Sequence, residues 1–100
     1  MIRHILLIAF VSDITSEKLN RFREGFLGIP AVVEGISGVE WGVNDSPENK
    51  NAGFTHSVLM TFIDESALLH YLHHPEHEEL KAIFLPFIRD IIVFDYLVNE

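Results

Sequence analysis

The chain has 100 residues, of which 48% are hydrophobic, and this is enough for one domain with a core of its own. Its formal charge of −8 argues against a nucleic-acid partner, because binding phosphates in any sequence needs clustered Lys and Arg. The chain lacks cysteine, which excludes disulfides, thiolate nucleophiles and Cys-based metal sites and suits a reducing compartment such as the cytoplasm.

An apolar run at residues 2–11 predicts the first strand. A secretory signal is the alternative, but His4 interrupts the run and no small-residue cleavage site follows it. The run is also too short to span a membrane. We therefore expect a cytoplasmic protein with a single domain, residues 1–100, no targeting segment and no membrane partner.

A helix is predicted after the first strand. Thr15 can cap its first turn, and Gly28 and Pro30 are expected to end it. Spacings of three and four residues predict a buried stripe made of Leu19, Phe22 and Phe26. Two strands should follow, because residues 39–44 alternate between apolar and polar and residues 54–63 are largely apolar. The polar segment 45–53 is expected to be the loop between them.

Pro75 divides the second half of the chain. Asp64 or Ser66 can cap a second helix, which Pro75 must break because proline lacks an N–H donor and clashes with the preceding turn. Proline is favoured at the first position of a helix, so a third helix is expected over residues 76–88. The last strand is predicted at residues 90–98.

The resulting order, β-α-β-β-α-β, predicts a ferredoxin-like α+β sandwich, with helices on one face of an antiparallel sheet. The first and last strands are nevertheless apolar on both sides. If the second face met water, it would expose a larger apolar patch than soluble monomers usually tolerate. We therefore expect a homodimer packed sheet to sheet, which forms a dimeric α+β barrel with an interface made by Ile5, Leu7, Ile92, Phe94 and Tyr96.

Polar residues on the helix-facing side of the sheet are the first candidates for a site. By strand alternation, His4, His56 and Asp95 all point between sheet and helices. Each one alone is most simply a hydrogen-bonded core residue. Because buried polar groups cost free energy without partners, their convergence with Tyr71 and His77 indicates a polar network or a pocket.

Residues 70–80, HYLHHPEHEEL, hold four of the six histidines. Tyr71 lies near the end of the second predicted helix and His77 near the start of the third, so both flank one junction. His73 and His77 have the i, i+4 spacing of helical metal ligands, but Pro75 lies between them and no carboxylate or thiolate set completes a site. We expect no metal, and a solvent-facing position for three histidines: His70, His73 and His74.

These motifs resemble the stress-responsive A/B barrel domain family of dimeric α+β barrels, and within it the olivetolic acid cyclase-like branch of plant polyketide cyclases. The matching segments are RHILL, EWG, GFTH, MTF, YLHHPEH and VFDY. The resemblance implies a homodimer of ferredoxin-like subunits. It implies that His77 is the general base in an aldol condensation of a linear poly-β-keto substrate, supported by a hydrogen bond from Tyr71. It also implies that His4, His56 and Asp95 are polar pocket residues.

Such a reaction needs no cofactor. A neutral histidine can remove a proton next to a ketone, and a tyrosine hydroxyl can donate to the enolate oxygen. The ligand would be a small apolar or polyketide-like molecule, held by an apolar pocket made of Leu6, Ile8, Phe22, Phe26, Val58, Ile83 and Phe87. The same residues would also make an ordinary core, so a non-catalytic stress-responsive or ligand-binding dimer is the alternative. An open cavity beside His77 would favour the enzyme.

Overall fold

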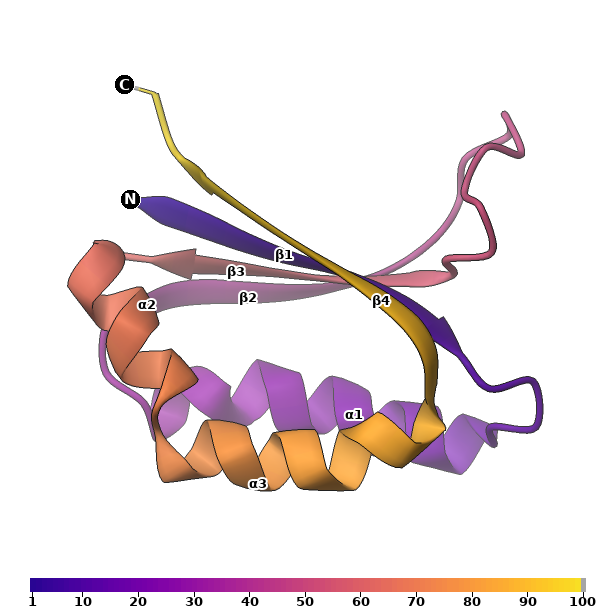
Figure 1. The fold of residues 1–100 in the computed structure, drawn as a ribbon, viewed down its shortest axis with the longest axis horizontal. Helices are drawn as coiled ribbons and strands as arrows, with labels where there is room; N and C mark the ends of the chain where they lie inside the picture. The colour runs from indigo at the N-terminus through magenta and orange to yellow at the C-terminus, as the bar shows by residue number, and fades with distance from the viewer. Residues whose placement is uncertain (100) are drawn as a thin grey trace.

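The computed structural model describes residues 1–99, so Glu100, the last residue of the predicted domain, lies outside the described residues. Figure 1 shows one layer of strands with all three labelled helices on the same side of it. The strands are β1 (Ile2–Phe10), β2 (Ile36–Val43), β3 (His56–Phe62) and β4 (Ile88–Leu97). The helices are α1 (Ser16–Gly28), α2 (Glu65–Leu72) and α3 (Pro75–Phe84), and short 3-10 turns at Ile29–Ala31 and Leu85–Phe87 follow α1 and α3.

The four strands form one antiparallel sheet in the order β2-β3-β1-β4. Together with the helices on one face, this arrangement confirms the predicted ferredoxin-like α+β fold. β1 is a central strand, and His4 on it lies opposite Met60 of β3 and Asp95 of β4. The register therefore places a histidine and a carboxylate side by side on the helix-facing side of the sheet.

The helix starts follow from local capping. The Thr15 side chain accepts a hydrogen bond from the backbone N–H of Lys18 at 3.1 Å and begins α1, as predicted. Of the two candidates for α2, Asp64 is the cap, because its carboxylate accepts from the backbone N–H of Ala67 at 2.8 Å. Gly35 lets α2 pack closely, since a Cβ at this residue would lie 2.6 Å from the Cβ of Ala67.

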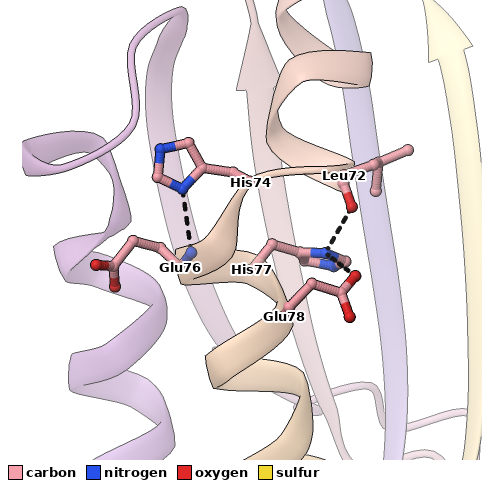
Figure 2. A network of polar contacts seen from close by, with 5 residues as sticks. All are labelled: Leu72, His74, Glu76, His77 and Glu78. Atoms are coloured by element: carbon pink, nitrogen blue, oxygen red, sulfur yellow. Dashed lines mark hydrogen bonds and ion pairs between the residues drawn. The ribbon is translucent and has the colours of Figure 1, made fainter.

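Pro75 breaks one helix and begins the next, as predicted. It occupies the first turn of α3, where its missing N–H removes no helical bond. The ring of His74 caps this helix, because Nδ1 accepts from the backbone N–H of Glu76 at 3.1 Å (Figure 2). The junction of α2 and α3 therefore brings the end of one helix against the start of another.

Several predicted boundaries are wrong. α3 ends at Phe84 rather than residue 88, because Pro86 has no N–H to continue the helical hydrogen bonds, and the chain goes on as the 3-10 turn Leu85–Phe87. β4 accordingly begins at Ile88. β2 begins at Ile36, three residues before the predicted start, with a register shift between Ile36 and Gly38 that hides the alternation at this end.

The core lies between the sheet and the helices. Its largest fully buried side chains are Tyr71, Phe22, Phe62, Ile8, Met60, Val33 and Val58. The opposite face of the sheet carries no helix (Figure 1). Apolar side chains on that face remain exposed, at 60% for Phe94 and about 40% for Leu7, Ile92 and Tyr96. No helix within residues 1–99 is both long and apolar enough to cross a lipid bilayer.

Candidate active site

A cavity of about 280 Å³ lies between the sheet and the helices, near the lower end of the sizes typical of small-molecule pockets. It is bounded by β1, β4 and all three helices. Its lining is mainly apolar, and the polar side chains in it are His4, Tyr71, His77 and Lys81. The apolar lining residues are Leu6, Phe26, Leu72, Leu80, Phe84, Leu85, Ile91 and Val93. The cavity is therefore suited to a small apolar molecule that carries a polar group.

His77 projects from the first turns of α3 toward the end of α2 (Figure 2). Its Nδ1–H donates to the backbone carbonyl of Leu72 at 3.1 Å. In a neutral imidazole only one nitrogen carries hydrogen, so this bond leaves Nε2 with a free lone pair. Because the side chain is 20% exposed and lines the cavity, His77 can accept a proton there.

Burial lowers the pKa of His77 below its ordinary value of 6.5. Four neighbouring groups have smaller effects on this pKa. The bond to Leu72 and the carboxylate of Glu78, 3.7 Å from Nδ1, raise the pKa, while Lys81 and His4 lower it. The ring is therefore neutral at pH 7, as a general base must be.

Tyr71 lies against His77, with ring centroids 4.6 Å apart. The residue is 1% exposed, and burial raises the pKa of its hydroxyl to about 12, so the hydroxyl stays protonated at neutral pH. Tyr71 also lines the cavity, so its protonated hydroxyl can donate a hydrogen bond to a ligand there.

A second histidine borders the same cavity. His4 is 5% exposed, and its Nδ1–H donates to Oδ1 of Asp95 at 2.5 Å, across neighbouring strands. The carboxylate fixes the ring orientation and the tautomer, as in carboxylate–histidine pairs of acid/base sites. The His4 ring also packs edge-on against Tyr71 at 6.4 Å. The structure thus brings four predicted polar residues together: His4, Asp95, Tyr71 and His77.

His56 does not join them, which corrects the prediction of one polar group of five. It lies opposite Ile8 on β1, four residues from His4 and so about 13 Å along the strand. Its ring packs against Phe10 at 5.1 Å and Trp41 at 5.4 Å. Burial lowers the pKa of His56, so this histidine is a neutral member of an aromatic cluster at the far end of the sheet.

The predicted apolar pocket residues separate into three groups. Leu6 and Phe26 line the cavity. Four others belong to or pack against the core without lining it: Ile8, Phe22, Val58 and Phe87. The prediction for Ile83 is wrong, because this residue is 45% exposed and borders a different depression, between α1 and α3. It follows His77 by six residues, which at 3.6 residues per turn rotates it well away from the cavity.

Several cavity residues escaped the sequence interpretation, although helical spacing could have found them. Leu80, Lys81 and Phe84 follow His77 by three, four and seven residues, so they share its face of α3. On β4, Ile91 and Val93 alternate in phase with Asp95 and also line the cavity.

The remaining histidines lie at the junction surface. His70 and His73 are exposed, as predicted, whereas His74 is half-buried because it caps α3. Residues 1–99 contain no group of three or more His, Cys, Asp or Glu side chains arranged to hold a metal ion.

Comparison with known proteins places this site in a family context. Residues 2–98 match the family described as the stress-responsive A/B barrel domain. The chain is 32% identical over 95 residues to the stress-response A/B barrel domain-containing protein HS1 of Arabidopsis thaliana, covering 95% of this chain and 87% of that protein. It is 25% identical over 95 residues to olivetolic acid cyclase of Cannabis sativa, covering 95% and 94% of the two chains.

Solved structures share the fold over nearly the whole chain. The structure of At3g17210 from Arabidopsis thaliana superposes with a TM-score of 0.94 at 30% identity, covering 100% of this chain and 97% of that one. Hydroxynitrile lyase from Passiflora edulis has a TM-score of 0.92 at 24% identity, with 99% and 94% covered. A dimeric ferredoxin-like protein of unknown function from Jannaschia sp. has a TM-score of 0.85 at 22% identity, with 97% and 98% covered.

Proposed function

Because the chain belongs to the stress-responsive A/B barrel domain family, we propose that it is a homodimeric, cofactor-independent acid/base enzyme of the cyclase or lyase type. His77 is the general base and Tyr71 the hydrogen-bond donor. The substrate is a small, largely apolar carbonyl compound of the polyketide-like kind.

One observation carries this proposal. The bare Nε2 of a neutral histidine and the free hydroxyl of a neutral tyrosine border the same mostly apolar cavity. A base and a donor in such a space can divide one proton-transfer reaction between them. The open cavity beside His77 favours this function over a non-catalytic barrel filled by its own side chains.

The proposed aldol reaction begins when Nε2 of His77 takes the proton from the carbon next to a ketone. The C–H electron pair moves into the enolate, whose oxygen accepts a hydrogen bond from the Tyr71 hydroxyl. The enolate carbon then attacks a second carbonyl of the same chain and forms the new C–C bond. The resulting alkoxide takes the proton back from His77, which restores the base. In the lyase direction the same steps run in reverse.

His4 completes the polar wall of the cavity in this proposal, and Asp95 supports it from outside the lining. Because Asp95 holds the Nδ1–H of His4, the other ring nitrogen of His4 is free to contact a polar group of the ligand. His4 therefore acts as a substrate-binding residue, and Asp95 as the residue that positions it.

Relatives support an enzyme of this type without naming its substrate. One similar protein is olivetolic acid cyclase, and one protein of the same fold is hydroxynitrile lyase. Both names describe the making or breaking of bonds in small molecules. The cytoplasmic location expected from the composition stays a prediction.

The homodimer is expected to use the outer face of the sheet, with Ile5, Leu7, Ile92, Phe94 and Tyr96 at the interface. Structural neighbours described as dimeric support this part of the proposal. Light scattering at micromolar concentration should report twice the 11.4 kDa chain mass. Phe94→Glu should shift the protein toward monomer, because it places a charge in the apolar interface. A wild-type protein that is monomeric and free of aggregation would contradict the interface.

A substrate screen tests the proposed activity. Short poly-β-keto thioesters are incubated with the protein and followed for ring closure, and cyanohydrins are followed for cleavage to a carbonyl compound. Wild-type protein should turn over at least one compound in these sets, and His77→Ala should lose that turnover. A complete lack of turnover across both sets, together with no binding at the cavity, would favour the non-catalytic alternative.

A further inference from the structure

Lys81 is a feature of the cavity that the proposed reaction does not use. Among the side chains that line the cavity, it alone carries a permanent positive charge. It follows His77 by four residues, one turn of α3, so both side chains project from the same face of the helix. Its charge is close enough to lower the pKa of His77.

Lys81 has no counter-ion in residues 1–99. The ion pairs of that part of the chain both involve histidine, and none places a carboxylate within 4.0 Å of Lys81. The nearby carboxylates are otherwise placed, since Asp95 accepts from His4 and Glu78 lies 3.7 Å from His77. A chain with a net charge of −8 therefore presents an unpaired ammonium group at an apolar cavity.

We propose that the cavity selects small organic acids, with Lys81 as the residue that binds the carboxylate of the ligand. This inference rests on the proposed function and narrows its substrate class. The apolar part of the ligand occupies the space between Phe26, Leu80 and Phe84, and its reactive carbonyl lies toward His77. Lys81 is a specificity-determining residue in this arrangement, because it discriminates between an acid and its neutral analogue.

A ligand carboxylate bound at Lys81 would also affect the basicity of His77. His77 becomes positively charged when it takes a proton, and the neighbouring ammonium of Lys81 opposes that charge. The other groups facing His77 are Tyr71 from α2, His4 with Asp95 from the sheet, and Glu78 from its own helix. A carboxylate bound at Lys81 cancels the repulsion, so an acidic substrate makes His77 a stronger base than a neutral one does.

Two ligands of nearly equal shape test the inference, 3-phenylpropanoate and 3-phenylpropanamide. Calorimetry should show that wild-type protein binds the acid about 2- to 5-fold more tightly, since an ion pair with the exposed Lys81 contributes up to about 1 kcal/mol. Lys81→Met should bind both ligands equally. Lys18→Met is the matched control, because it removes the same charge from a lysine that lies over Phe87 and outside the cavity, and it should keep the preference.

A second readout separates this inference from the proposed function. The acid should raise the pKa of His77, measured from its ring signals by NMR, more than the amide does, and Lys81→Met should abolish the difference. Equal affinity for acid and amide in the wild type, or an unchanged preference in Lys81→Met, would overturn the role of Lys81 alone. If neither ligand perturbs the signals of His77, the cavity is not a ligand site and the proposed function fails with the inference.

Discussion

Replacing His77 by alanine is expected to lower the turnover of a substrate found in the screen by about 10²- to 10⁴-fold, the usual contribution of a general base. The variant keeps the cavity but loses the ring that packs directly against Tyr71 and carries a bare Nε2. The rate constant kcat should fall more than KM changes, because proton removal occurs in the transition state.

The fold should survive this change. His77 lies in the first turns of α3, where Pro75 and the cap from His74 still define the start of the helix. His73→Ala is the matched control, since it removes an exposed histidine from the same junction and should leave turnover unchanged. Wild-type turnover in His77→Ala, with folding verified by circular dichroism, would make His77 a helix-start residue of a binding or structural barrel.

Tyr71→Phe is expected to lower kcat by up to about 10²- to 10³-fold, less than His77→Ala at most. The substitution keeps the buried ring and its packing against Phe62 and His77, and deletes only the hydroxyl. Burial keeps that hydroxyl protonated, with a pKa of about 12, so the group acts as a donor and not as a base. Steady-state kinetics of the purified variant measure the loss.

The division between kcat and KM decides whether the tyrosine acts on the enolate. Loss of a donor that contacts the enolate lowers kcat, whereas loss of a donor that binds ground and transition states equally raises KM alone. Tyr96→Phe is the control, because Tyr96 lies on the outer face of the sheet. An unchanged kcat in Tyr71→Phe would exclude a contact that strengthens as the enolate forms.

The fold can be predicted from the sequence because short stretches of the chain determine its helices and strands. The alternation in the strands, the caps at Thr15 and Asp64, and the restart at Pro75 each follow from short stretches of chain. The new helix that begins at Pro75 also predicts that Tyr71 and His77 lie at one junction. In the structure, the centroids of their rings are 4.6 Å apart.

The content of the site was only partly predictable. Strand alternation tells which face of the sheet His56 occupies, but its distance from His4 depends on how β1 and β3 pair, which the alternation does not show. Ile83 was assigned by its apolar character, although its position on α3 turns it outward. The sequence does not predict Lys81 as a cavity residue, because a lysine on a helix is usually solvated and the cavity it borders exists only once the side chains pack.

The protonation of His77 is the property on which the proposed chemistry depends most, and nitrogen-15 NMR of the histidine rings measures it without a substrate. As the pH falls, His77 should stay neutral to below 6.5, because burial lowers its pKa. Its neutral form should carry hydrogen on Nδ1, which donates to Leu72, and leave Nε2 bare. The acid limb of activity should then also lie below pH 6.5. A neutral form protonated on Nε2, or a pKa above 6.5, would contradict the assignment of His77 as the general base.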